Sequence, residues 1–456
     1  MSKEPEFLSV IDTESENLIR LADTVWDNPE LAFKEVKSSA ALKDFLKARG
    51  FTIQEGLGGL PTSFIASYGS GHPEIGFIGE FDALSGLSQQ AMVPEQRKQP
   101  GMADGHGCGH HLYGAGAVAA ALAVQQYLKT SGKPGTVKVL GCPGEEGGSG
   151  KAYMARDGAF SSLDAAMGGH PESMWAVRTR GSLACCLILY RFEGRSSHAG
   201  AAPHRGRSAL DAVELMNVAV NFLREHIPYD HRVHYAITDP GGTAPNIVQS
   251  HAEVLYMMRA KDNADLRALC ERVRKCAEGA AIATETTYSS EFHSASSNLI
   301  TIPTLQKTLH QAMMDLTLPQ PDEKDIAFAK EMIAKNMPDR DPALPLYPCE
   351  VLPLPDRIAP HFGSTDTGDI SWNCPTVQMH VGCWIPGSIN HSWHTVAQGK
   401  GGFAHRAMLY TGKALALAAV RLMQDPELLK AAKAEHLERT GGKYEPAMPP
   451  EVMPPL

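Results

Sequence analysis

The order of predicted strands and helices changes along the chain, and this change restricts the folds that are open to it. Up to about residue 180, apolar strands alternate with helices, as in EIGFIGEFDAL, LYGAGAVAAALAVQQYLK, TVKVLGC and LDAAMGG. Such alternation is typical of an α/β domain, in which helices cover a largely parallel sheet. From residue 181 to 297 the predicted order becomes strand, helix, strand, strand, helix, strand. That order is the split-βαβ pattern of a ferredoxin-like domain.

Helical patterns resume after residue 297, so we expect the first domain to continue beyond an insertion. The sequence therefore predicts an α/β domain in two segments, 1–180 and 298–456, with an α+β domain inserted at 181–297. The last residues, YEPAMPPEVMPPL, form a proline-rich C-terminal tail. Because proline-rich segments favour extended, semi-rigid conformations, we expect this tail to be an exposed extension.

Composition excludes several classes of protein. Of the 456 residues, 43% are hydrophobic and 20% are charged, which is typical of a globular chain. The net charge of −9 and the lack of basic clusters argue against nucleic acid or an anionic membrane as partner. The N-terminal sequence lacks the pattern of a secretory signal. The odd number of cysteines, 9, is scattered along the chain, so we expect a reducing cytoplasm rather than a disulfide framework.

Residues 101–116, GMADGHGCGHHLYGAG, bring Cys108 and His110 together at the predicted start of a helix. Glycine between them allows close approach of the backbone. Cysteine and histidine at this spacing occur in metal sites, and in thiol enzymes where cysteine is the nucleophile and histidine its base. In a chain with 19 histidines the pair also arises by chance. The motif alone leaves these three interpretations open.

Three further elements fall in predicted loops or strand ends of the same α/β domain. They are Glu145-Glu146 in GCPGEEGGSG, His170 in GGHPE and His391 in GSINHSWHT. Adjacent carboxylates repel each other, so they favour a nearby cation, or a division of labour between a ligand and a base. Cysteine, histidine and carboxylate together suit zinc or another divalent transition metal. With five candidate ligands and one further acid, the set suits two metal ions that share a water molecule better than it suits a single ion.

Several motifs, in order along residues 28–423, resemble the M20 metallopeptidase and amidohydrolase family. They are GHGCGHHLYGAG, GCPGEEGGSGKAYM, GGHP, SSHAGAAPHRGRSALDA, APNIVQSHAEVLYMMRA, GSTDTGDISW and HSWHTVAQGKGGFAHRAMLYTGKA. Within the family they are most similar to the cysteine-ligand subgroup of the p-aminobenzoyl-glutamate hydrolase B-subunit type. The resemblance implies a mixed-sheet, zinc-peptidase-like catalytic domain. It also implies that the inserted ferredoxin-like domain serves as a lid and dimerisation domain.

The resemblance implies roles for the residues of the metal centre. Cys108 would bridge two divalent metal ions, zinc or manganese. The other ligands would be His110, Glu146, His170 and His391. Glu145 would be the general base, and Asp82 would orient a ligand without touching the metal.

The resemblance also implies roles in the inserted domain. His198 would lie near the axis of a homodimer and reach into the partner's site, where it would polarise the scissile carbonyl. Asn246 and Arg259 would bind the carboxylate of the substrate. An arginine suits that task because its planar guanidinium can bind both carboxylate oxygens.

Two positions depart from the family pattern. His111 stands where the subgroup usually has Asp or Asn, so we expect a difference in the residues around the metal ligands or in the metal preference. Glu80 stands where other branches have a histidine ligand, so no metal role is assigned to it.

Together with the resemblance, these residues predict a metal-dependent amidohydrolase that cleaves an N-acyl amino acid, and the resemblance suggests p-aminobenzoyl-glutamate as its substrate. A metal-bridging water would attack the carbonyl, with Glu145 as general base. A dipeptidase or carboxypeptidase of the same fold is an alternative. Two others are a thiol hydrolase with Cys108 as nucleophile, and a metal-binding scaffold without activity. The name of the subgroup raises the further expectation of a second, different chain as partner.

Overall fold

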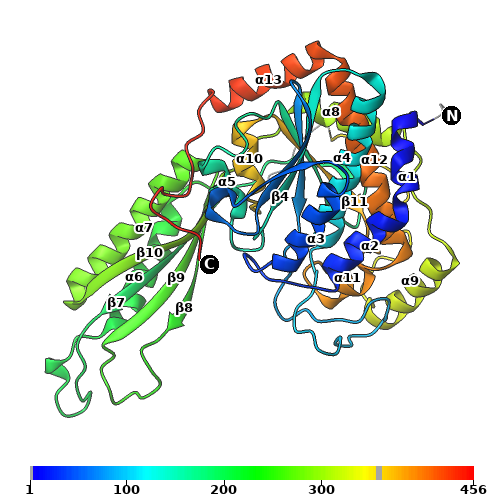
Figure 1. Cartoon of the computed structure of the whole chain (residues 1–456). Helices are drawn as coiled ribbons and strands as arrows, with labels where there is room; N and C mark the ends of the chain where they lie inside the picture. Colours follow the sequence, from blue (N-terminus) through cyan, green and yellow to red (C-terminus); the bar gives the residue numbers. More distant parts are fainter. Residues whose placement is uncertain (1–3, 356–361) are drawn as a thin grey trace.

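The structure is a computed structural model that describes residues 4–355 and 362–456. It contains a seven-stranded sheet covered by helices and, to one side of it, a four-stranded sheet with two helices (Figure 1). The predicted α/β fold class is therefore confirmed. In the part of the chain that the structure describes, no helix is long and apolar enough to cross a membrane.

The seven-stranded sheet is mixed, as predicted. Its strands in spatial order are β1 (Thr52–Glu55), β2 (Phe64–Ser70), β4 (Gly135–Cys142), β3 (Glu74–Glu80), β5 (Ala165–Glu172), β11 (Thr376–Gly382) and β6 (Ala176–Val177). The four strands β4, β3, β5 and β11 are parallel, whereas β1, β2 and β6 pair antiparallel at the two sides. The carboxyl ends of the parallel strands therefore meet at one edge, where open α/β sheets bind their ligands.

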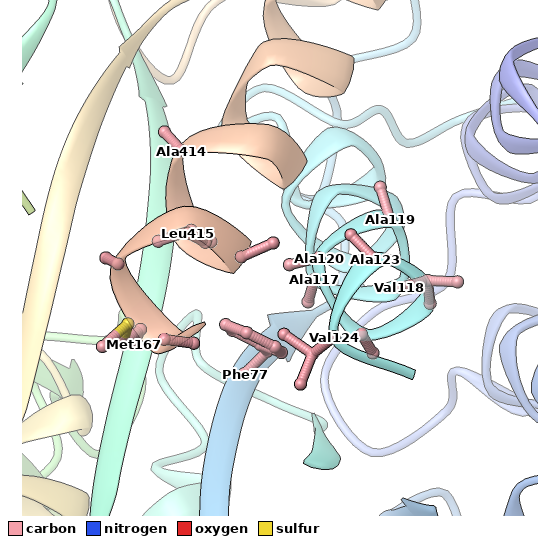
Figure 2. Packing of buried hydrophobic residues seen from close by; sticks show 14 of the residues in the cluster. Phe77, Ala117, Val118, Ala119, Ala120, Ala123, Val124, Met167, Ala414 and Leu415 are labelled. Atoms are coloured by element: carbon pink, nitrogen blue, oxygen red, sulfur yellow. The ribbon is translucent and has the colours of Figure 1, made fainter. Parts of the chain in front are cut away.

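Two long helices of small residues pack against each other over this sheet. Helix α4 (His110–Ser131) is rich in alanine and lies beside α12 (Gly402–Gln424) (Figure 2). A Cβ atom at Gly412 would lie only 2.6 Å from the Cβ of Ala119, so glycine allows this close approach. Buried side chains of both helices face Phe77 of β3 and Met167 of β5 (Figure 2). This contact holds the start of α4 at the carboxyl edge of the sheet.

Apart from the two helices that belong to the smaller sheet, nine further α-helices complete the part of the chain that the structure describes. They are α1 (Ser9–Thr13), α2 (Ser15–Trp26), α3 (Val36–Lys47), α5 (Gly150–Arg156), α8 (Pro303–Met314), α9 (Glu323–Asn336), α10 (Thr367–Asn373), α11 (Trp393–Gln398) and α13 (Pro426–Thr440).

The four-stranded sheet follows the predicted ferredoxin-like order. Its strands β7 (Ala184–Glu193), β8 (Arg232–Asp239), β9 (His251–Ala260) and β10 (Thr287–Ser296) are antiparallel, in the order β10-β7-β9-β8. Helices α6 (Ala209–Leu223) and α7 (Asn263–Thr284) connect and cover them. The start of β7 lies near the large sheet, because the backbone N–H of Leu183 donates to the carbonyl of Gly363 at 3.0 Å. The opposite end of β7 points away from it (Figure 1).

The C-terminal tail is packed, so the expectation of an exposed extension is wrong. Met448 is 1% exposed, and the guanidinium of Arg156 donates to the carbonyl of Val452 at 2.7 Å. Asn263, at the start of α7, donates to the carbonyl of Glu445 at 3.0 Å. Proline lacks an N–H group but keeps its carbonyl acceptor, so a proline-rich segment can be held by side-chain donors.

Candidate metal centre and active site

The candidate ligands lie together because they follow the parallel strands of the large sheet. Asp82 comes two residues after β3, and Glu145 and Glu146 follow β4. His170 lies near the end of β5. His391 lies on the loop between β11 and α11. Helix α11, which follows directly, is bound to the cysteine motif by a hydrogen bond of 2.6 Å from the Thr395 hydroxyl to the carbonyl of Gly107. Four distant segments of chain thus converge at one edge.

Gly109 is required between Cys108 and His110. Its φ of +83° lies in the left-handed region that favours glycine. A Cβ atom at this position would lie 2.7 Å from the ring of Trp384 and 2.8 Å from Pro171. The turn therefore brings both neighbouring side chains to the amino end of α4.

The five predicted metal ligands lie together in the structure. Sγ of Cys108 lies 3.2 Å from Nε2 of His170. Three groups have candidate ligand atoms within 4.8 Å of one another: Cys108, His110 and His170; Cys108, Glu146 and His391; His110, Glu145 and Glu146. Cys108, His110 and Glu146 each belong to two of these groups, and Cys108 is the one residue common to the first two.

The chemistry of the cluster fits divalent cations. Nε2 of His110 and Oε1 of Glu146 are buried and make no hydrogen bond of good geometry in the protein, although Oε2 of Glu80 and Nε2 of His391, respectively, lie 3.2 Å from them. Burial raises the pKa of Glu146 to about 7, His110 opposes this rise, and the nearby carboxylates of Glu145 and Asp82 increase it. A positive charge beside these groups would stabilise the carboxylates and use the unpaired atoms. Sulfur, imidazole and carboxylate donors together suit zinc, whereas manganese is suited by the carboxylate donors.

Asp82 connects two of the candidate ligands. Its Oδ1 lies 2.8 Å from Nδ1 of His110, and its Oδ2 accepts a hydrogen bond of 2.8 Å from the backbone N–H of Glu146. The side chain of Asp82 is completely buried. It therefore fixes the orientation of the His110 ring and directs Nε2 towards the cluster.

Two residues beside Glu145 and His110 were not identified from the sequence. The hydroxyl of Thr365 donates a hydrogen bond of 2.9 Å to Oε1 of Glu145. The ammonium of Lys151 is buried and lies 2.8 Å from Oε1 of Glu80 and 2.5 Å from Oδ1 of Asp366. Thr365 and Asp366 belong to the GSTDTGD motif and Lys151 to GCPGEEGGSGKAYM, but nothing in those motifs specifies the pairing.

Glu80 and His111, the two departures from the family pattern, have different surroundings. Oε2 of Glu80 lies 3.2 Å from Nε2 of His110, so Glu80 contacts a candidate ligand. Burial opposes its ionisation, but Lys151 and His110 lower its pKa below the usual value. His111 instead bonds through Nε2 to the carbonyl of Gly399 at 2.9 Å, and burial lowers its pKa well below the usual value. In the described part of the chain, His111 belongs to none of the candidate ligand groups.

The residues predicted to act on the substrate are divided between two places. Arg259 lies near the large sheet, where its guanidinium donates a hydrogen bond of 2.8 Å to the hydroxyl of Ser364, next to Thr365. His198 follows the far end of β7, and Ala199 beside it donates to the carbonyl of Asn246 at 2.9 Å. His251, at the end of β9 nearer His198, and Arg259 are eight residue steps apart, which is about 26 Å of extended strand. Within one chain, His198 and Asn246 therefore lie away from Arg259.

The sequence profile described as Peptidase family M20/M25/M40 matches residues 76–453. The B subunit of the p-aminobenzoyl-glutamate hydrolase of Escherichia coli (strain K12) is 40% identical, with 97% of this chain and 97% of that protein covered. An Xaa-Arg dipeptidase of Mus musculus is 30% identical, with 93% and 90% covered.

Solved structures show the same fold. A dinuclear metal-binding M20 peptidase of Bacillus subtilis has a TM-score of 0.60 at 17% identity, covering 91% of this chain and 99% of that one. An aminobenzoyl-glutamate utilization protein of Klebsiella pneumoniae also has a TM-score of 0.60 at 17% identity, covering 91% and 98%. The extent of the profile match and the identity to the Escherichia coli hydrolase identify the family: the chain belongs to Peptidase family M20/M25/M40 and is a metal-dependent amidohydrolase.

Proposed function

We propose that this chain hydrolyses the amide bond of N-acyl amino acids, p-aminobenzoyl-glutamate among them, with two divalent metal ions and Glu145 as general base. Cys108, His110, Glu146, His170 and His391 would hold the ions. The observation that supports this most directly is the convergence of Cys108, Glu146 and His391 with Cys108, His110 and His170, so that one thiol serves two ligand groups. Zinc or manganese ions held there would act as Lewis acids on the amide carbonyl and make a bound water more acidic.

Glu145 would transfer the proton. Its Oε1 accepts the hydrogen bond from Thr365, which leaves Oε2 to take a proton from the attacking water. The same carboxyl group then delivers that proton to the amine that leaves. Arg259, fixed by Ser364, offers a planar guanidinium for the carboxylate that every N-acyl amino acid carries.

His198 would complete the site of a partner chain. Its Nδ1 accepts hydrogen bonds from the backbone N–H groups of Gly200 at 3.2 Å and Ala201 at 3.1 Å. These bonds favour the tautomer with hydrogen on Nε2, which can donate to the substrate carbonyl as it gains negative charge. Asn246 lies beside His198 and would bind the substrate from the same partner.

A homodimer through the inserted domain would bring these residues to the second site. Strand β8 is at the edge of its sheet, and its Tyr235 and Ile237 are 37% and 43% exposed. Helix α6 exposes Leu215, Val218 and Phe222, spaced three and four residues apart, so they form one apolar stripe. An exposed sheet edge beside an apolar stripe favours association of two copies.

Mixing two inactive variants tests the shared site. In a dimer that joins a His198→Ala chain to a Glu145→Gln chain, one site has both Glu145 and the partner's His198. Random exchange of chains between dimers should restore about a quarter of the wild-type activity if His198 acts across the dimer. If His198 acts within its own chain, the mixture should stay inactive. Light scattering should give the mass of two chains, and Ile237→Lys should shift it towards one.

The main test combines metal analysis with a hydrolysis panel of p-aminobenzoyl-glutamate, other N-acyl amino acids and Xaa-Arg dipeptides. Purified protein should contain close to two ions per chain and cleave at least one N-acyl amino acid. Glu145→Gln should keep the metal but lower kcat by about 10²–10⁴-fold. The exposed Glu55→Gln should leave both unchanged. A Glu145→Gln protein with wild-type turnover would refute the assigned base, and full metal content without turnover on the whole panel would favour the scaffold alternative.

Two further proposals concern the setting of the enzyme. Because the relative at 40% identity is named as one of the subunits of a hydrolase, we propose that a second, different chain joins this one. Assaying the chain alone shows whether that partner is needed for activity. We also propose that the protein works in a reducing cytoplasm, because all nine cysteines are free thiols.

A further inference from the structure

Two arginine side chains are fixed to the same short segment that holds the carboxylate of Glu145. Ser364 in this segment accepts the hydrogen bond from Arg259, and Thr365 next to it donates to Glu145. On the other side, Nη1 of Arg178 donates to Oε1 of Gln378 at 3.2 Å. The amide nitrogen of Gln378 then donates to the hydroxyl of Thr367 at 3.4 Å. Both guanidinium groups are thus linked to residues 364–367.

Gln378 also links Arg178 to the metal centre. Its amide nitrogen donates to the hydroxyl of Tyr113 at 2.9 Å. The Tyr113 ring stands edge-on to the ring of His170, with ring centroids 5.8 Å apart. Burial lowers the pKa of Arg178, while Glu145 is the carboxylate that most favours its charged form. The guanidinium therefore lies in the field of the proposed general base.

The Arg178 guanidinium has N–H groups for which the described part of the chain provides no acceptor. It carries five N–H groups. Among the described residues, Gln378 provides the one side-chain acceptor found for it, and no carboxylate forms an ion pair with it. Each nitrogen of the Arg178 guanidinium is therefore either hydrogen-bonded or accessible to solvent. A charged planar group with free, accessible donors beside a hydrolytic site is suited to bind a carboxylate from the substrate.

We infer that Arg178 determines specificity by binding a side-chain carboxylate of the substrate, so that the enzyme prefers N-acyl derivatives of acidic amino acids. The inference rests on the proposed function and extends it. Arg259 would bind the α-carboxylate common to all N-acyl amino acids, and Arg178 would bind the second carboxylate of glutamate or aspartate. The same positive charge would repel a cationic side chain. This chain would therefore differ from its relative named Xaa-Arg dipeptidase.

The experiment compares N-benzoyl-glutamate with N-benzoyl-glutamine and N-benzoyl-arginine. Glutamine has the shape of glutamate without the charge, so the ratio of kcat/KM between these two substrates isolates the charge. We expect the wild type to favour glutamate by about 10- to 100-fold, the range for a hydrogen bond to a charged group. Arg178→Gln should reduce this ratio to near one. Arg178→Lys, which keeps the charge but loses the planar fork, should give an intermediate ratio.

Arg180→Gln is the matched control, because Arg180 is exposed and lies two residues away. It should leave the ratio unchanged. Binding gives a second measurement: calorimetry on metal-loaded Glu145→Gln protein should show the same preference in Kd, and adding Arg178→Gln should remove it.

The outcomes separate this inference from the proposed function. A wild type without preference for glutamate over glutamine would overturn the inference even if no Arg178 variant folds. A ratio that survives Arg178→Gln would also overturn it. If the enzyme turns over none of the substrates, the proposed function is refuted. The Kd values would then still test whether Arg178 binds the side-chain carboxylate.

Discussion

Thr365 donates a hydrogen bond of 2.9 Å to Oε1 of Glu145, across 220 residues of sequence. The segment that carries Thr365 is itself fixed, because Asp366 accepts a hydrogen bond of 2.9 Å from the backbone N–H of Lys151. Lys151 is the second residue of α5, just after the loop with Glu145. The hydroxyl therefore holds the carboxylate in one orientation before substrate binds.

Replacing Thr365 with valine should lower kcat by about 10- to 100-fold, because the bond to a charged group is lost while the shape is kept. KM should change little, since Thr365 donates to Glu145 and makes no hydrogen bond to Arg259, the residue proposed to bind the substrate carboxylate. Thr365→Ser keeps the hydroxyl and should recover most of the rate. Metal content measured on the same preparations should be equal in all three proteins. A Thr365→Val enzyme with wild-type kcat would show that Glu145 needs no such partner.

Removing the metal should distinguish the metal mechanism from the thiol mechanism. A chelator should abolish turnover, and adding zinc or manganese should restore it. Bound metal should protect Cys108 from alkylation, and chelation should expose it, as followed by mass spectrometry of the modified peptide. Cys108→Ala should lose metal, whereas Cys349→Ala, at an exposed thiol, should keep it. Turnover that is insensitive to chelators but stopped by alkylation would instead favour Cys108 as nucleophile.

Glu35 should make stability fall as pH rises. Its buried carboxylate accepts hydrogen bonds from the N–H groups of Phe33 at 2.9 Å and Gly144 at 2.8 Å. Burial, with Asp82 adding to it, raises its pKa from 4.5 to about 7. The unfolded chain therefore loses this proton first as pH rises. The contribution of Glu35 is fully present below pH 4.5 and declines up to about pH 7.

Glu35→Gln should remove that dependence. The difference in free energy of unfolding, variant minus wild type, should grow by up to about 3 kcal/mol between pH 4.5 and 7. Urea denaturation of metal-free protein at several pH values measures it, and effects of other titrating groups cancel in the difference. Parallel stability curves for the two proteins would contradict a raised pKa.

The sequence was sufficient to predict which side chains cluster at this edge of the sheet, but not the buried pairs around them. Cys108, Glu146, His170 and His391 could be predicted because unusual residue types lie beside glycines at the ends of parallel strands, which must meet at one edge. Lys151 and Asp366 pair across 215 residues, and both types are common on any surface. The packing of the proline-rich tail was also missed, because it depends on donors such as Arg156 and Asn263 in distant segments. Pairings of this kind are determined by tertiary structure and leave no local pattern.

Lys151 should be essential for stability as well as for the site. Its side chain is 0% exposed and offsets two buried carboxylates, Glu80 and Asp366. Lys151→Met keeps much of the volume but leaves both acids without their cation, and breaking a buried pair typically costs about 3–5 kcal/mol. Chemical denaturation should show a loss of this size. Lys138→Met removes a lysine that is 15% exposed beside a carboxylate, Glu74, that is 19% exposed, and should cost about 1 kcal/mol or less. Equal losses in the two variants would mean that Glu80 and Asp366 are neutralised by protonation rather than by Lys151.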